Sequence, residues 1–336
     1  MLPELQRFLV RRFCSFTTFA AQIRQISKTN GLAGLINSSK TFSDMKAYVF
    51  PGQGSQAEGM GKELYESNTQ ANELYEQANT LLGWRISDVM FHGTKEDLTQ
   101  TNVTQPAVFL ESIVRAKVAG SVFQPAAVAG HSLGEFTALC AAGALSFEEA
   151  FLLVSKRAFA MQKACELADG TMAAVLGMED SIVEEVCQSI ENEIVVAANY
   201  NSPGQLVISG SRKGIEMAVE GLTTRGAKRV LILPVGGAFH SPLMKPAQDE
   251  LEEAIKSAIF LKPVCPVYQN VHALPVTDPE EIRKNLIAQL TAPVRWTKTI
   301  ENMIADGITE FVEVGASAVL RGMIRKINKD AITDGL

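Results

Sequence analysis

A serine between two glycines, placed where a strand gives way to a helix, constrains the fold of this chain more than any other feature. Residues 126–130 form a short apolar run, residues 130–134 read GHSLG, and small helix-forming residues follow to residue 142. A G-x-S-x-G sequence between a strand and a helix is typical of a nucleophile elbow, whose tight turn exposes the serine hydroxyl. Ser132 is therefore a candidate nucleophile, and a purely structural turn is the alternative.

A serine nucleophile needs a general base, and the chain has four histidines. His92 and His272 lie in polar loops, and His131 is expected to point away from the turn and to support the loop. His240 lies in a glycine-rich loop that leads into a helix, which can bring an imidazole toward Ser132. We expect His240 to be the base, with a capping or surface histidine as the alternative.

The usual acidic partner of such a histidine is missing from the expected place. Hydrolases with this turn orient the imidazole with an Asp or Glu, but residues 228–240 contain no acid. A neutral acceptor must then hold the ring, which disfavours a lipase or esterase.

Arg157 is the most informative charged residue. On a helix over residues 147–165 its neighbours three, four and seven positions away are apolar, so its guanidinium is expected to point inward. A buried guanidinium requires a partner. That partner is either an internal carboxylate or the carboxylate of a substrate, which suits the planar fork of arginine.

A second glycine-rich corner, FPGQGSQAEGMG at residues 50–61, follows the first predicted strand. It loosely matches a dinucleotide-binding fingerprint, but no helix and strand ending in an acid follow at the required distance. A loop that offers main-chain N–H groups to a developing oxyanion fits equally well.

The order of the predicted elements changes once along the chain. Strands and helices alternate up to residue 167 and again after residue 235, which predicts an α/β domain. The pattern includes a helix over about residues 60–83 and a long helix that a capping box, Ser146 with Glu149, is expected to open. Between them the pattern reads β-α-β-β-α-β, typical of a ferredoxin-like unit. We predict a large α/β-hydrolase-like domain, residues 44–167 and 236–330, interrupted by a small ferredoxin-like subdomain, residues 168–235.

Residues 1–43 differ from the rest. Their first forty residues carry six basic residues and one acid, with Leu and Phe spaced along one helix face and many Ser and Thr. This composition predicts an organelle transit peptide, with a basic surface helix as the alternative. Its arginines and its Phe/Leu helix favour the mitochondrial matrix, and the plastid stroma is the alternative.

The overall composition excludes several classes of protein. The net charge is −6, and the chain without its basic leader is more acidic still, so a nucleic-acid partner is not expected. No apolar run is long enough for a membrane helix, and the five cysteines have no metal-ligand spacing. We expect no membrane association and no bound metal.

The motifs FPGQGSQ, TQPAVF, GHSLGE, GAFHSPLM and NLIAQLTAPVRW, in this order from about residue 46 to residue 326, together resemble the malonyl-CoA:acyl carrier protein transacylase family of type II fatty-acid synthesis. The resemblance implies transfer of a malonyl group from malonyl-CoA to the phosphopantetheine thiol of acyl carrier protein through a malonyl-serine. A serine hydrolase or thioesterase is the alternative. The sequence VGAS after Glu313 departs from the family's usual Gly-Pro-Gly.

The resemblance also implies a role for each site residue. Ser132 would be the nucleophile and His240 the base, and Arg157 would bind the malonyl carboxylate. The main-chain N–H groups of Gln53 and Leu133 would form the oxyanion hole, and Gln289 would supply the neutral acceptor for His240. Further residues expected at the substrate cleft are Asn199, Asn201 and Phe239.

The remaining expectations concern partners. Because both this chain and carrier proteins are acidic, docking needs a local basic patch. Lys228 and Arg229, which we expect next to the cleft, are the candidates, with a solvated basic edge as the alternative. No cofactor beyond the substrate malonyl-CoA is implied, and a monomer is the family's default.

Overall fold

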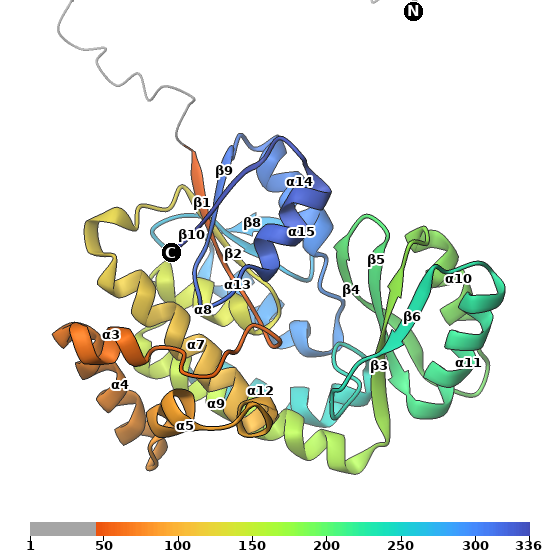
Figure 1. Ribbon diagram of the computed structural model, residues 1–336, viewed down its shortest axis with the longest axis horizontal. Helices are drawn as coiled ribbons and strands as arrows, with labels where there is room; N and C mark the ends of the chain where they lie inside the picture. Colours follow the sequence, from red (N-terminus) through yellow and green to blue (C-terminus); the bar gives the residue numbers. More distant parts are fainter. Residues whose placement is uncertain (1–44) are drawn as a thin grey trace, which may run out of the picture. The chain divides into compact units, whose positions relative to one another are not determined.

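Two β-sheets organise residues 45–336, the part of the chain that the computed structural model describes (Figure 1). The predicted transit peptide lies outside the described residues. The larger sheet has the strand order β10-β9-β1-β2-β7-β8; β8 is antiparallel to β7, and all other pairs are parallel. Its strands are β1 (Lys46–Phe50), β2 (Ala127–Gly130), β7 (Val267–Gln269), β8 (Leu274–Val276), β9 (Glu310–Glu313) and β10 (Ile332–Gly335).

Helices cover both faces of this sheet. Tyr48 and Phe50 of β1 pack into one core, and Ala47 and Val49 pack into another, as the alternation of side chains along a strand requires. Burial on both faces explains why the central strands are apolar throughout. The helices are α3 (Lys62–Ser67), α4 (Thr69–Leu82), α5 (Ile86–His92), α6 (Lys95–Thr99), α7 (Thr101–Val118), α8 (Leu133–Ala141), α9 (Phe147–Leu167), α12 (Lys245–Ser257), α13 (Pro279–Ala288), α14 (Trp296–Ala305) and α15 (Val319–Ile327).

Short 3-10 turns occur at Gly120–Val122 (η1), Pro242–Met244 (η2) and Gln289–Thr291 (η3). Within residues 45–336, no helix combines the length and the apolar character needed to cross a bilayer.

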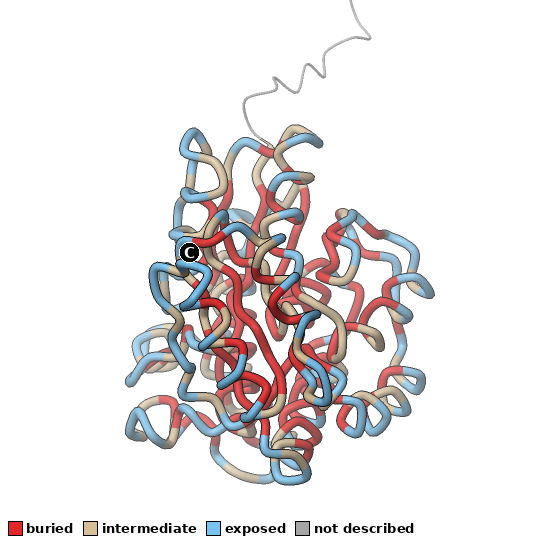
Figure 2. The backbone as a smooth tube through the Cα atoms, turned by 90° about the vertical axis from the view of Figure 1, so that its right-hand side faces the viewer, coloured by how far each residue is buried: buried red, intermediate tan, exposed pale blue. Residues whose placement is uncertain are grey.

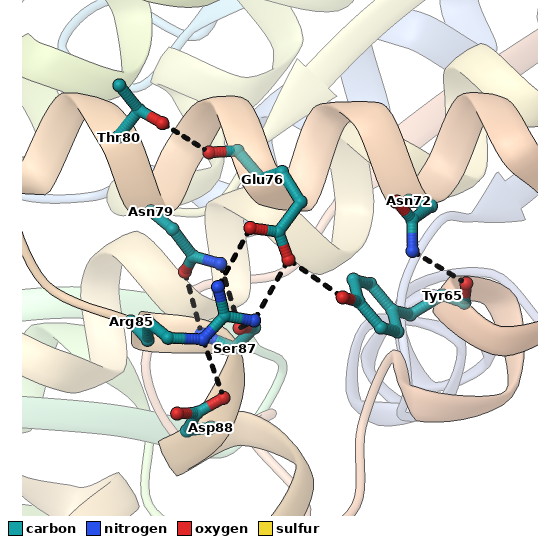
Figure 3. A network of polar contacts seen from close by, with 8 residues as sticks. All are labelled: Tyr65, Asn72, Glu76, Asn79, Thr80, Arg85, Ser87 and Asp88. Atoms are coloured by element: carbon teal, nitrogen blue, oxygen red, sulfur yellow. Dashed lines mark hydrogen bonds and ion pairs between the residues drawn. The ribbon is translucent and has the colours of Figure 1, made fainter.

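The helix predicted over residues 60–83 is two helices. Asn68 ends α3 in an extended conformation, and its side chain caps α4 by accepting from the N–H of Ala71 at 3.0 Å. A polar network then fixes these helices to α5 (Figure 3). Arg85 contacts Glu76 at 2.8 Å, the Tyr65 hydroxyl donates to the same carboxylate at 2.7 Å, and these contacts hold the pKa of Glu76 well below its usual range.

The smaller sheet is antiparallel, with the strand order β4-β5-β3-β6. In chain order its segment comprises β3 (Gly170–Leu176), α10 (Asp180–Ser189), β4 (Val195–Ser202), β5 (Gln205–Ser211), α11 (Arg212–Thr224) and β6 (Arg229–Ile232). Ala173 and Val175 of β3 pack with residues of α10 and α11 in a separate core, whereas Met172 belongs to the core of the larger unit.

Main-chain hydrogen bonds join the smaller sheet to the larger unit. Tyr200 N–H donates to the Val294 carbonyl at 2.9 Å, and Val294 N–H donates to the Ala198 carbonyl at 2.8 Å. The edge strand β4 is thereby fixed to the segment between η3 and α14, and buried backbone occurs in both parts (Figure 2). At this junction Asn199 forms a β-bridge with Val294.

Two strands were not predicted from sequence. Strand β8 contains Pro275, which is tolerated because β8 is an edge strand. Strand β10 is the opposite edge and its residues are largely exposed, so it has no apolar alternation to detect. At the start of α9, Ser146 accepts from the Glu149 N–H at 3.1 Å as predicted, but Glu149 Oε1 accepts from the Ile259 N–H at 2.8 Å instead of closing a capping box.

Candidate active site

Ser132 lies in a strained turn between β2 and α8. Its φ is 54° and its ψ is −107°, a conformation that non-glycine residues rarely adopt. A Cβ on Gly130 would lie 1.9 Å from the carbonyl carbon of Gly134, and one on Gly134 would lie 2.0 Å from the Phe50 oxygen. Both flanking positions therefore require glycine, and the G-x-S-x-G sequence forms the predicted elbow.

His240 and Ser132 are paired directly. The Ser132 Oγ lies 2.7 Å from His240 Nε2, and the histidine follows the loop after β6 with a φ of 58°. Nδ1 of His240 is 3.1 Å from the carbonyl oxygen of Gln289 and 3.0 Å from that of Ala292. Because a carbonyl can only accept, Nδ1 carries the proton, and Nε2 is left as the acceptor for the serine hydroxyl.

The neutral acceptor for the imidazole is thus a pair of main-chain carbonyls, one of which belongs to Gln289. The Gln289 side chain does something else: its Nε2 donates to the Ser132 carbonyl at 3.0 Å, and its Oε1 lies 3.5 Å from Arg157 Nη2. Burial and the neighbouring Arg157 charge lower the pKa of His240 from 6.5 to about 3, so the ring is neutral at physiological pH.

Arg157 points inward from α9, as predicted, and is 1% exposed. Its Nη2 donates to Ser132 Oγ at 3.0 Å and its Nη1 donates to Gln105 Oε1 at 2.5 Å. Among the described residues its Nε has no hydrogen-bond partner and no carboxylate forms an ion pair with it. Burial lowers its pKa to about 9, and the more distant Glu135 opposes this shift. An internal salt bridge therefore does not explain the buried charge.

These side chains surround a cavity of about 120 Å³. Its lining residues are Gln53, His131, Ser132, Leu133, Arg157, Met161, Met172, Asn199, Leu233, Val235, Phe239 and His240. The cavity combines one buried cation and a paired serine and histidine with an apolar wall, which suits a small acyl group that carries a negative charge.

The two predicted oxyanion donors lie at this cavity. Leu133 is the first residue of α8, so its N–H has no acceptor within the helix. Gln53 lies in the turn after β1 and also lines the cavity. Main-chain N–H groups at a helix N-terminus favour a developing negative charge.

The two predicted asparagines differ in position. Asn199 lines the cavity, and its buried Oδ1 has no hydrogen-bond partner within residues 45–336. Asn201 does not line it: its Oδ1 lies 2.8 Å from His131 Nε2, so the pair supports the loop beside Ser132. His131 also packs against Trp296, with ring centroids 5.7 Å apart, in the supporting position predicted for it.

Lys228 and Arg229 do not line the cavity, contrary to the expectation that they lie next to the cleft. Arg229 opens β6, whereas Leu233, after its other end, lines the cavity. At about 3.3 Å per residue the four-residue separation is roughly 13 Å. Both side chains are exposed.

Sequence reasoning missed the groups that hold the site residues in place. Gln105, the partner of Arg157, is 1% exposed on α7. The available sequence signal was a glutamine beside the apolar residues that follow Pro106. Ala292 acts only through its carbonyl and leaves no signal in its side chain.

The fold and the paired Ser132 and His240 define an acyltransferase, and comparison with known proteins agrees. Residues 47–333 match the acyl transferase domain family, and the chain belongs to this family. The malonyl CoA-acyl carrier protein transacylase of Bacillus subtilis is 44% identical over 84% of this chain and 90% of its own length. The Staphylococcus aureus protein of the same name is 40% identical over 84% of this chain and 92% of its own length.

Solved structures give the same result. The malonyl CoA-acyl carrier protein transacylase of Coxiella burnetii has a TM-score of 0.84 and 38% identity, covering 87% of this chain and 94% of that one. A malonyl-transacylase in complex with a type II polyketide synthase acyl-carrier protein also has a TM-score of 0.84, with 35% identity over 87% of this chain and 96% of that one.

Proposed function

We propose that this protein transfers the malonyl group of malonyl-CoA to the phosphopantetheine thiol of acyl carrier protein and so supplies fatty-acid synthesis. The names of its relatives support this reaction. The observation that carries it is the buried Arg157, which has no carboxylate partner among the described residues and lies beside the Ser132 hydroxyl. A guanidinium in this position favours an acyl group that ends in a carboxylate.

In the first half-reaction, Ser132 Oγ attacks the thioester carbonyl and its proton passes to His240 Nε2. The N–H groups of Gln53 and Leu133 donate to the oxyanion, and Arg157 binds the malonyl carboxylate. The carbon–sulfur bond then breaks, and the CoA sulfur takes the proton from His240. The enzyme is left with a malonyl ester on Ser132.

In the second half-reaction the carrier's thiol attacks this ester, and the same groups act in reverse order. His240 accepts the thiol proton and returns it to Ser132 Oγ. Because its pKa is lowered to about 3, the imidazole is a weak base toward water, which favours a thiol acceptor over hydrolysis. All of these steps use side chains and main-chain groups of the chain itself, without a metal or other cofactor.

The carrier protein is proposed to dock through Lys228 and Arg229, whose exposure and charge suit an acidic partner. We also propose a monomer, and the predicted division into a hydrolase-like domain with a ferredoxin-like insert at residues 168–235. The insert is supported by the order β3, α10, β4, β5, α11, β6 and by the antiparallel strand order β4-β5-β3-β6.

The first 43 residues are proposed to direct the protein to the mitochondrial matrix, with the plastid stroma as the alternative. Their basic, acid-poor composition supports an organelle address. Expression of residues 1–43 fused to a fluorescent protein, with their arginines replaced by glutamine as the control, tests the address by microscopy. Uniform cytosolic fluorescence of the unmodified fusion contradicts it.

Intact-mass spectrometry tests the reaction. Addition of malonyl-CoA is expected to give an adduct of one malonyl group, which the carrier protein with its thiol arm discharges and which the carrier without that arm leaves in place. A serine hydrolase instead releases malonate at a comparable rate without any thiol acceptor, and that result overturns the proposal.

A further inference from the structure

Asn270 lies at the end of β7, on the strand beside the one that carries the nucleophile turn. Strands β2 and β7 are parallel with Ala129 opposite Tyr268, which brings Asn270 level with the elbow. Its Oδ1 accepts from the Ser132 N–H at 2.7 Å, and its Nδ2 donates to the Gly130 carbonyl at 2.7 Å. One side-chain amide therefore spans the turn and satisfies a main-chain group on each side of it.

Asn270 is itself held by the first turn of α8. Its N–H donates to Glu135 Oε2 at 2.7 Å, and Gln269 Nε2 donates to Glu135 Oε1 at 3.1 Å. Asn270, Gln269 and Glu135 are all 0% exposed. The contacts close a ring from Ser132 through Asn270 and Glu135 back along α8 to Ser132.

This ring acts on the strained residue itself. Ser132 has a φ of 54°, a backbone conformation that non-glycine residues rarely adopt. Such a conformation persists only where contacts with the surrounding structure enforce it. Only a group that donates and accepts at once satisfies both Gly130 and Ser132 here, which an amide does and a carboxylate does not. The ring also occupies the N–H of Ser132, so the oxyanion donors must be other groups, in agreement with Leu133 and Gln53.

We propose that Asn270 is a positioning residue that holds Ser132 in its attacking geometry, with Glu135 as the anchor of Asn270. The proposal rests on the proposed role of Ser132 as nucleophile. It assigns to the buried Glu135 a function outside the chemical step: its carboxylate fixes the amide that fixes the serine. Burial raises the pKa of Glu135 to about 7, and the donated Asn270 N–H opposes this shift.

The test compares Asn270→Asp with Asn285→Leu. Asn285 is buried in the same polar network and donates to Gln269 Oε1 at 2.9 Å, but it does not contact the turn. Both changes disturb buried hydrogen bonds, and only the first removes the donor to Gly130. Rapid-quench measurement of Ser132 acylation by malonyl-CoA, with the folded fraction determined by circular dichroism, gives a rate constant and an apparent affinity for each variant.

We expect Asn270→Asp to lower the acylation rate constant per folded molecule about 10- to 100-fold, with little change in apparent affinity, as a misplaced nucleophile requires. Asn285→Leu is expected to lower the melting temperature but to keep the rate constant within about twofold of wild type. If Asn270→Asp does not fold, Asn270→Ser, which keeps one hydrogen-bonding group, replaces it with the same expected direction.

Equal losses in the Asn270 and Asn285 variants, or a wild-type rate constant in a folded Asn270 variant, overturn the positioning role. Failure of the underlying proposal gives a different result, because the wild-type enzyme, measured in the same series, would then carry no malonyl group on Ser132.

Discussion

Arg157 Nη2 lies 3.0 Å from the Oγ of Ser132, so a buried cation and the nucleophile occupy one small cavity. The same guanidinium contacts the amide oxygens of Gln105 and Gln289, and no carboxylate of the part of the chain that the structure describes. Neutral acceptors hold its geometry, and no carboxylate of the described residues is in direct contact with its charge. The site is therefore complementary to an acyl group that brings its own negative charge.

Replacement of Ser132 by alanine is expected to abolish the malonyl adduct and to leave the fold intact. The turn is strained with any side chain, and alanine adds no atom to it. Intact mass after incubation with malonyl-CoA measures the adduct, and a melting curve checks the fold. A Ser132→Ala variant that is still acylated at the wild-type rate would show that another residue is the nucleophile.

Replacement of His240 by alanine is expected to slow acylation by about 10² to 10⁴, the usual contribution of a general base. The Ser132 hydroxyl loses the only imidazole nitrogen within hydrogen-bond distance among the described residues. His131→Ala is the control, because that ring contacts Asn201 instead. Near-normal activity of the His240 variant, together with loss in the His131 variant, would reverse the two assignments.

The pH dependence of acylation is expected to lack the usual histidine inflection. The pKa of His240 is lowered from 6.5 to about 3 by burial and by the charges of Arg157 and His131. The neutral, active form of His240 then persists as the pH falls from about 7 to about 5, so His240 itself contributes no decrease in kcat/KM for malonyl-CoA over this window. The buried Glu135, whose pKa is raised to about 7, is the group of the site that titrates there. An inflection near pH 6.5 in the stopped-flow profile of kcat/KM that persists in Glu135→Gln contradicts this.

The same pKa shift affects stability with a defined sign. Between about pH 6.5 and pH 3 the unfolded chain binds a proton at His240 that the folded chain does not. The free energy of unfolding therefore falls as the pH falls through this window. Urea unfolding at several pH values measures this free energy, and its decrease with falling pH is expected to be smaller in His240→Gln than in wild type. An equal decrease in both proteins would show that His240 is not the buried neutral group.

Reversal of Lys228 and Arg229 to glutamate is expected to raise KM for acyl carrier protein and to leave acylation by malonyl-CoA nearly unchanged. These side chains are exposed and distant from the cavity, so they act on docking and not on chemistry. Reversal of Lys95 and Lys117, on α6 and α7, makes the same change in net charge and is the control. An equal increase of KM in both double variants would show that Lys228 and Arg229 form a solvated basic edge and not a docking site.

The sequence predicted those parts of the site that depend on local patterns. The strand, the glycine pair and the helix around Ser132 follow from sterics, and the inward direction of Arg157 follows from the 3.6-residue period of α9. The asparagine at the elbow, Asn270, was not predicted, since it lies at the end of a short strand whose register with β2 is set by tertiary packing. The acceptors of His240 are main-chain carbonyls, which any residue supplies.

The fold was predicted where elements are long or apolar on both faces. Edge strands β8 and β10 were missed because they bury little, and the break between α3 and α4 was missed because a single capping residue, Asn68, decides it. The predicted position of Lys228 and Arg229 next to the cleft was wrong, because the sequence does not specify which end of β6 reaches the cavity.

The most direct measurement is the ratio of malonyl to acetyl transfer by Arg157→Ala, beside wild type and the exposed neighbour variant Lys156→Ala. Loss of a buried charge pair costs about 2–5 kcal/mol, or at least about 30-fold in malonyl transfer. We predict this loss together with improved acetyl transfer, because the unpaired charge no longer opposes a neutral acyl group, and no change in Lys156→Ala. A parallel loss toward both acyl groups with a lowered melting temperature would contradict the account and leave Arg157 a structural residue.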